Sequence, residues 1–185
     1  MRKKVVVILA DGFEEIEAVT IINTLRRADI KVTVCGLDTD LVKGSREITI
    51  SADKLLEKSD LASEYDACVL PGGMPGAKNL ANSDMVKELL TKMHAQGKTI
   101  AAICSSPALV LSYAGILDNK SATCFPGMRG NFSNSTTYKE DNVVIDGNII
   151  TSRSPATAMG FSLSIVEILC GKDIASKVGK ALLAT

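Results

Sequence analysis

The sequence has no tryptophan, only one histidine, and few aromatic residues of any kind, 4% of the chain. With a single imidazole and no close spacing of histidine and cysteine, it contains no pattern that suits a zinc site. Basic and acidic residues are balanced at 21 each, so no excess of positive charge indicates binding to a nucleic-acid backbone. We therefore expect neither a metal ion nor a nucleic-acid partner.

Long hydrophobic runs are also absent. No stretch approaches the roughly 18 apolar residues that a membrane-spanning helix requires. The apolar run near the start ends at Ala10 and meets Asp11, which is early for a signal peptide, and no small-residue cleavage pattern follows. We expect a soluble, non-exported, cytoplasmic protein that does not engage a membrane.

The five cysteines include no CxxC pair, and their odd number argues against a disulfide framework. In a reducing compartment they are free thiols, and most are expected to be small buried hydrophobic residues. They are Cys35, Cys68, Cys104, Cys124 and Cys170.

What the sequence does contain is an alternation of strand and helix patterns without a linker or repeat. The length of 185 residues suits a single domain spanning 1–185. Such an alternation predicts a three-layer α/β/α sandwich with a mainly parallel sheet. Residues 44–50 are expected to be extended and 126–141 to form a loop. The expected strands are Lys4–Ala10, Lys31–Gly36, Asp66–Leu70, Thr99–Ile103, Ala122–Cys124 and the hairpin Asn142–Ser152, and the expected helices are Glu14–Ala28, Asp84–Gln96, a segment from Pro107, Pro155–Cys170 and Ile174–Leu183.

Three segments carry unusual residues to the carboxyl ends of these strands, which is where open α/β sheets bind ligands. They are DGFEEIE after the first strand, PGGMPG after the third and CSSP after the fourth.

Cys104 lies at the turn between a predicted strand and a predicted helix. The N–H groups and partial positive charge at the start of that helix are expected to lower the pKa of the thiol and make Cys104 a nucleophile. The alternative is a buried core cysteine at the end of a strand.

The Pro71-Gly72-Gly73 segment follows a buried strand. Glycines there let backbone N–H groups approach a ligand and stabilise an oxyanion, although the same pattern also describes an ordinary tight turn. The segment has neither the GK[ST] sequence of a phosphate loop nor a GxGxxG pattern.

Three glutamates open the first predicted helix. The simple interpretation is a favourable interaction of acids with the helix dipole. On a helical wheel, however, Glu14 falls within the apolar arc, with Glu17 and Glu15 at its two edges. A carboxyl group on a buried face has a raised pKa suited to general acid–base work, and the wheel does not choose between Glu14 and Glu17.

Two further residues are interpreted as structural. His94 lies late in a polar helix and is expected to be a solvated surface residue. Arg153 precedes the predicted helix Pro155–Cys170, where a salt bridge or loop contact is the simpler interpretation than an anion site.

Taken together, VVVILADGFEEIEAVT, RRADIKVTVCGL, VLPGGMPGAKNL, IAAICSSPALVL and ITSRSPATAMGFSL resemble the DJ-1/ThiJ/PfpI superfamily, closest to its DJ-1 branch, from about residue 4 to 183. The resemblance implies a flavodoxin-like α/β sandwich with a cysteine nucleophile elbow. It also implies a homodimer without a metal or organic cofactor.

The resemblance assigns roles to residues. It implies that Cys104 is the reactive cysteine and that Glu17 is its protonated carboxyl partner. Backbone amides of the family's glycine turn correspond to Gly72 and Gly73, and Ser105 follows the cysteine. Glu14, Arg46 and Arg27 match further acidic and basic positions that the family places near the site or the dimer interface.

This chain departs from the family at three places. Cys124 or Phe125 stands where the DJ-1 branch has a histidine. Ser105 replaces the histidine that follows the cysteine in the PfpI peptidase branch, which argues against a Cys–His peptidase. The family's SRGPGTA is SRSPATA at 152–158, a change expected to narrow the pocket mouth or alter its turn.

The resemblance implies a cofactor-independent glyoxalase, converting methylglyoxal or glyoxal to lactate or glycolate, or a deglycase acting on glycated protein. The alternative is a redox-sensing or chaperone-like stress protein whose Cys104 is oxidised to sulfinic acid. A binding protein without turnover is a third interpretation.

Overall fold

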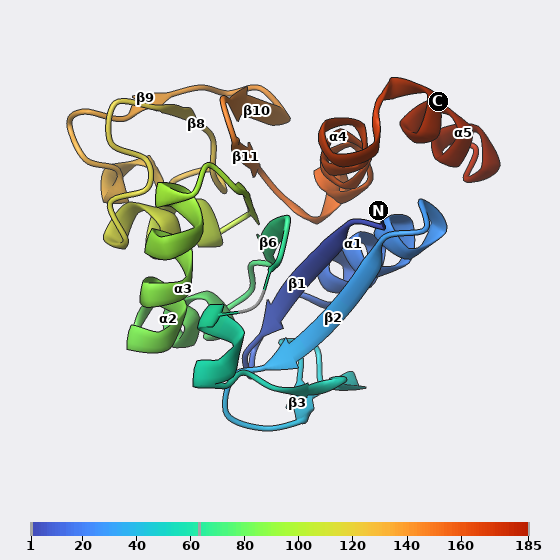
Figure 1. Ribbon diagram of the computed structural model, residues 1–185. Helices are drawn as coiled ribbons and strands as arrows, with labels where there is room; N and C mark the ends of the chain where they lie inside the picture. Colours follow the sequence, from blue (N-terminus) through green and yellow to red (C-terminus); the bar gives the residue numbers. More distant parts are fainter. Residues whose placement is uncertain (1, 63, 185) are drawn as a thin grey trace.

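The computed structural model describes residues 2–62 and 64–184. At its centre is a seven-stranded sheet in the order β10-β11-β7-β6-β1-β2-β5 (Figure 1). β10 runs antiparallel to β11, and the other neighbouring strands are parallel. These strands are β1 (Lys4–Leu9), β2 (Lys31–Gly36), β5 (Lys54–Leu55), β6 (Ala67–Leu70), β7 (Thr99–Ile103), β10 (Val143–Asp146) and β11 (Ile149–Ser152).

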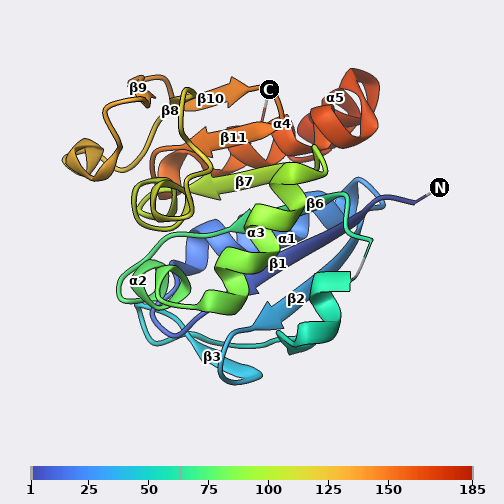
Figure 2. The ribbon, with the colours of Figure 1, turned by 60° about the vertical axis from the view of Figure 1, so that its left-hand side comes forward.

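Helices cover both faces of this sheet, so the expected three-layer α/β/α sandwich is confirmed. One face carries α1 (Glu15–Arg27), α4 (Ala158–Cys170) and α5 (Lys172–Ala181), and the other carries α2 (Gly76–Ala81) and α3 (Asp84–Ala95) (Figure 2). The short helical turns are η1 (Lys58–Ala62), η2 (Pro107–Leu111), η3 (Arg129–Asn131) and η4 (Pro155–Thr157). Among the described residues, no helix has the length and apolar character needed to cross a lipid bilayer.

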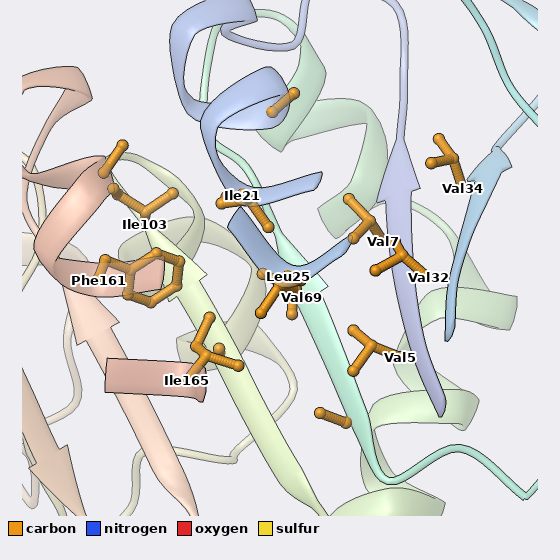
Figure 3. Close-up of a cluster of buried hydrophobic side chains, with 14 of the residues drawn as sticks. Val5, Val7, Ile21, Leu25, Val32, Val34, Val69, Ile103, Phe161 and Ile165 are labelled. Atoms are coloured by element: carbon orange, nitrogen blue, oxygen red, sulfur yellow. The ribbon is translucent and has the colours of Figure 1, made fainter. Parts of the chain in front are cut away.

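The alternation of side chains along β1 explains the two layers of core. Val5 and Val7 face α1 and α4, where they join a cluster with Ile21 and Phe161, whereas Val6 faces the layer of α2 and α3 (Figure 3). Each fully buried aliphatic side chain of this kind contributes about 1.5–3 kcal/mol to folding. Because β1 is buried on both faces, its sequence is a continuous β-branched run.

The structure adds elements that the sequence patterns did not predict. Helix α2 follows the PGGMPG segment directly. The piece expected to be extended, 44–50, is the turn and second strand of a hairpin formed by β3 (Leu41–Lys43) and β4 (Thr49–Ser51). The expected loop 126–141 contains β9 (Thr137–Tyr138), which pairs with β8 (Ser121–Ala122). Of the expected strand Ala122–Cys124, only Ala122 lies in a strand, because β8 covers Ser121–Ala122.

The sheet order brings the three unusual segments together. β1, β6 and β7 are consecutive neighbours and run parallel, so their carboxyl ends lie at the same edge. The segments that follow them begin with Asp11, Pro71 and Cys104, and they meet at this edge.

Candidate active site

Cys104 occupies a strained turn at the end of β7. Its φ of 65° lies in the left-handed region, which residues other than glycine rarely adopt. The backbone is held on both sides, because Cys104 N donates to the Ser152 carbonyl at 3.0 Å and Phe125 N donates to the Cys104 carbonyl at 2.7 Å. This is the geometry of a nucleophile elbow, in which a sharp strand-to-helix turn presents the reactive side chain.

The helical segment after Cys104 begins as expected, with Pro107 in its first turn, and continues as the π-helical turn η2. The backbone N–H groups of Ser105 and Gly73 donate hydrogen bonds to the Cys104 sulfur. The sulfur is therefore surrounded by donors from two of the three segments, and its residue is 8% exposed.

Glu17 comes from the remaining segment, DGFEEIE. It lies in the first turn of α1 and is completely buried. Its Oε2 accepts a hydrogen bond from Gly72 N at 2.7 Å. Its Oε1 is buried and makes no hydrogen bond within the described residues, although the Cys104 thiol is close enough for the two groups to change each other's pKa. The structure thus brings together Cys104 and Glu17, as expected.

Gly72 lies between the two reactive groups. A Cβ atom at this position would be 2.6 Å from Cys104 Cβ and 3.0 Å from Glu17 Oε2, so the turn has room only for glycine. Because the Gly72 N–H donates to Glu17, it is not free to stabilise a substrate oxyanion. The expectation that Gly72 supplies an oxyanion donor is corrected accordingly, whereas the N–H groups of Gly73 and Ser105 face the Cys104 sulfur, where a reacting atom would bind.

The electrostatics of the pair follow from burial. Burial raises the pKa of the Glu17 carboxyl to about 7, opposed by the Gly72 N–H and the Cys104 thiol, and Glu14 raises it further. Burial, followed by the charge of Glu17, raises the pKa of the Cys104 thiol to about 12. The N–H groups of Ser105 and Gly73 lower that pKa without cancelling these effects.

The expected lowering of the Cys104 pKa is therefore wrong. The first reason is that the sulfur is nearly enclosed, and the second is that it lies beside an acid, so an ionised thiol adds a second negative charge to one buried site. As the pH rises through about 7 the pair gains a single negative charge, held by the Glu17 carboxylate next to the Cys104 thiol. Such a pair can deliver a nucleophilic sulfur and then return a proton.

The other glutamates have different roles from those the wheel suggested. Glu14 lies outside the helix as its N-cap, with φ −88° and ψ 121°, and its Oε2 accepts from Glu17 N at 2.7 Å. Glu15 is buried and accepts hydrogen bonds from Ser45 Oγ, Arg46 N and Ile48 N. Glu15 therefore ties the β3–β4 turn to α1, a role that the sequence pattern gave no means of finding.

The two serines that follow Cys104 connect two segments of the site. Ser106 is fully buried, and its Oγ donates to the Pro71 carbonyl at 2.5 Å. Ser105 Oγ donates to the Gly73 carbonyl at 3.5 Å. These two hydroxyls fix the glycine turn against the elbow.

The arginines expected near the site are exposed. Arg46 donates to the Ser45 carbonyl at 3.1 Å, which places it at the β3–β4 turn, and Arg27 pairs with Asn23 on α1. Within the described residues, neither guanidinium forms a hydrogen bond or ion pair with Cys104 or Glu17. Arg153 lies at a third place, where it donates to the Glu140 carbonyl at 2.8 Å.

The two candidates for the missing histidine position differ in burial. Cys124 is fully buried, and burial raises the pKa of its thiol to about 11 despite the nearby charge of Arg153. Phe125 is 43% exposed, and its backbone N–H donates to Cys104.

His94 is half-buried rather than fully solvated. It precedes the amino end of β7, whereas Cys104 follows the carboxyl end, so no Cys–His pair forms. In the described part of the chain, no cluster of three or more histidine, cysteine, aspartate or glutamate side chains is arranged to hold a metal ion.

The fold and the site define a class of protein: a flavodoxin-like α/β sandwich with a cysteine at a nucleophile elbow, next to a buried carboxyl from the opening helix. The sequence matches the DJ-1/PfpI family over residues 3–168, and the chain belongs to this family.

Individual relatives agree with this assignment. The chain is 44% identical to protein dj-1beta of Drosophila melanogaster, over 99% of this chain and 98% of that protein. It is 30% identical to a protein of Pyrococcus abyssi that is named a deglycase, over 90% of this chain and 99% of that protein.

Solved structures show the same likeness. The crystal structure of Drosophila DJ-1beta superimposes with a TM-score of 0.94 at 43% identity, covering 99% of this chain and 98% of that one. Oxidized Toxoplasma gondii DJ-1 superimposes with a TM-score of 0.93 at 41% identity, covering 98% of both chains.

Proposed function

We propose that this protein is a cofactor-independent glyoxalase that also acts as a deglycase on glycated protein. The observation that carries the proposal is the contact between the Cys104 thiol and the buried Glu17 carboxyl, whose pKa is about 7. A nucleophile and a proton carrier matched to neutral pH are what this reaction needs. The deglycase name of the Pyrococcus relative supports the same class of chemistry.

The first step forms a carbon–sulfur bond. Glu17 accepts the thiol proton, and the Cys104 sulfur adds to the aldehyde carbon of methylglyoxal or glyoxal. The carbonyl π electrons move to oxygen, where the N–H groups of Gly73 and Ser105 stabilise the oxyanion. The product is a hemithioacetal.

The remaining steps redistribute hydrogen within the substrate. Glu17 first gives the thiol proton to the oxyanion, which restores the carboxylate. The carboxylate then removes the proton from the sulfur-bearing carbon and returns it to the adjacent carbon, while the hydroxyl proton moves from the first oxygen to the second, so that the hemithioacetal becomes the thioester of a 2-hydroxy acid. Water then cleaves the thioester, releasing lactate or glycolate and restoring the thiol. One dicarbonyl and one water give one hydroxy acid, so no external oxidant or reductant is required.

Deglycase action would use the same sulfur. Cys104 would attack the aldehyde-derived carbon of an early adduct, and the carbon–nitrogen bond would break as the protein amine leaves with a proton. The product would be the same hemithioacetal, which would rearrange to the thioester and be hydrolysed as above.

Consumption of methylglyoxal and formation of lactate by purified protein test this proposal. We expect loss of turnover in Cys104→Ala and in Glu17→Gln, and retention in Cys170→Ala, a matched control in a partly exposed cysteine at the end of α4. Equal rates for wild type and Cys104→Ala would overturn the proposal.

A second candidate function, sensing of oxidants, is favoured by the unpartnered Oε1 of Glu17. Peroxide would oxidise Cys104 to sulfenic and then sulfinic acid, and protonated Glu17 would donate a hydrogen bond to a sulfinate oxygen. Mild peroxide followed by peptide mass analysis tests it. Uniform oxidation of all five cysteines would refute the sensor role.

We also propose that two copies pair through the face formed by α1 and β4. Ile16, Val19 and Ile48 are exposed there, and Val19, Ile22 and Ile50 line one shallow groove. Sedimentation analysis should show a dimer. Val19→Asp should dissociate it, and Ile145→Asp, in an exposed position on β10, should not.

We further propose a reducing compartment such as the cytoplasm, which the free cysteines support.

A further inference from the structure

Two large apolar side chains are exposed at residues adjoining the nucleophile. Met74 is 52% exposed and directly follows Gly73, whose N–H donates to the Cys104 sulfur. Phe125 is 43% exposed, and its backbone N lies 2.7 Å from the Cys104 carbonyl oxygen. The backbone therefore places both residues at the edge of the sheet where the sulfur lies, although they are 51 positions apart in the sequence.

The charged groups around this position are mainly acidic or already engaged. Glu17 and Glu14 lie on the side of α1, and the charge of Glu14 raises the pKa of Glu17, which shows that the two carboxyls are close. Arg153 is the nearby cation on the other side, next to Cys124. Its Nη1 donates to the Glu140 carbonyl and its Nε is buried.

These features favour a neutral ligand over an anionic one. A carboxylate on the substrate would approach two acidic side chains. Arg153 has one nitrogen bonded to the Glu140 carbonyl, and its unpartnered Nε is buried away from a ligand at the surface. An apolar substituent would instead remove Met74 and Phe125 from water, which is favourable for both the ligand and the protein.

We propose that Met74 and Phe125 form an apolar rim that binds the substituent of a neutral carbonyl compound, so that the preferred substrates carry an aryl or branched alkyl group beside the reactive carbon. The inference rests on the proposed function in taking Cys104 as the residue that attacks the carbonyl. The two residues determine specificity and take no part in proton transfer.

Turnover of three probes tests the substrate class. Wild type should show a value of kcat/KM for phenylglyoxal about tenfold above that for methylglyoxal, a typical discrimination for an apolar pocket. 4-Carboxyphenylglyoxal, an anionic probe that carries the same ketoaldehyde group, should be turned over more slowly than phenylglyoxal. Phe125→Ala and Met74→Ala should lower kcat/KM for phenylglyoxal several fold more than kcat/KM for methylglyoxal, which removes most of the phenylglyoxal preference. Tyr113→Ala, which removes an exposed aromatic ring elsewhere, should retain the preference.

A labelling experiment separates this inference from the proposed function. The rates at which N-benzylmaleimide and N-(2-hydroxyethyl)maleimide modify Cys104 are measured by peptide mass analysis, with Cys170 in the same protein as the reference thiol. The benzyl reagent should be favoured at Cys104 by several fold over its preference at Cys170. That excess should fall to about one in the Phe125→Ala/Met74→Ala double variant.

The outcomes are distinct. Absence of turnover with a preserved labelling preference would refute the proposed function and retain the rim. Turnover without either preference, faster turnover of 4-carboxyphenylglyoxal than of phenylglyoxal, or an unchanged preference in the double variant would overturn the rim. Failure of both maleimides to reach Cys104 would overturn it as well, because the rim would then not open onto the sulfur.

Discussion

A Cβ atom on Gly72 would stand 2.6 Å from the Cβ of Cys104, closer than a Cβ atom approaches another atom in folded proteins. The same atom would be 3.0 Å from Glu17 Oε2, so glycine at this position is what allows the thiol and the carboxyl to meet. The reactive pair is therefore assembled around the backbone of a third residue.

Gly72→Ala should consequently separate the two groups. We expect at least a hundredfold loss of methylglyoxal turnover and a loss of about 1–3 kcal/mol in the free energy of unfolding, since overpacking a tight site forces neighbours to move. Gly130→Ala is the matched control, because a Cβ there meets no atom within 4 Å. Normal turnover in Gly72→Ala would show that the spacing is unimportant.

The raised pKa of Glu17 predicts a pH-dependent stability. Below pH 4.5 the carboxyl is protonated in both folded and unfolded chains, but above about 7 the folded protein holds a buried carboxylate. The destabilisation grows as pH rises through this window and reaches about 3 kcal/mol. Glu17→Gln stays neutral, so its stability relative to wild type should increase by that amount between pH 4.5 and 8 in urea titrations.

An exposed acid provides the control for this measurement. Glu88→Gln, on the solvent side of α3, should follow the wild-type dependence on pH. Parallel curves for wild type and Glu17→Gln would mean that the buried carboxyl does not titrate in this range.

The same titration should appear in the reactivity of Cys104. The pair gains its single negative charge as the pH rises through about 7, so the rate of Cys104 alkylation by iodoacetamide should rise with that apparent pKa. In Glu17→Gln no carboxylate is available to take the thiol proton, and the rise should move to higher pH. A profile identical in the two proteins would contradict coupling between the groups.

Ser106→Ala tests the hydrogen bond that fixes the glycine turn. Removing the 2.5 Å bond leaves the Pro71 carbonyl without its hydroxyl donor, for an expected cost of about 1–3 kcal/mol in stability and a lower kcat. Ser112→Ala removes a 2.7 Å bond to the Asn131 carbonyl outside the site and should leave kcat unchanged. Equal kcat values in the two variants would argue against a positioning role for Ser106.

The strands and the position of Cys104 could be predicted because they depend on local patterns. The run of apolar residues in β1 and the proline after CSS are direct signals of a buried strand and a helix start. Because strands joined by helices run parallel, the segments that follow them are expected at one edge, whereas the order of the strands comes only from the structure.

The different roles of Glu14, Glu15 and Glu17 could not be predicted from local patterns. A helical wheel assumes that Glu14 belongs to the helix, whereas the residue is an extended N-cap. Glu15 is buried by the β3–β4 turn, whose contact with α1 is not local in sequence. The sign of the Cys104 pKa shift depends on how completely the chain encloses the sulfur, which only the packed structure shows.

The strained backbone of Cys104 is fixed by two backbone hydrogen bonds, one to the carbonyl of Ser152 on strand β11 of the central sheet and one from the N–H of Phe125. Side chains such as Met74 project from segments that can change without disturbing that anchorage. Substitutions at such positions can therefore change which carbonyl compound binds best, while the backbone that presents the sulfur stays the same.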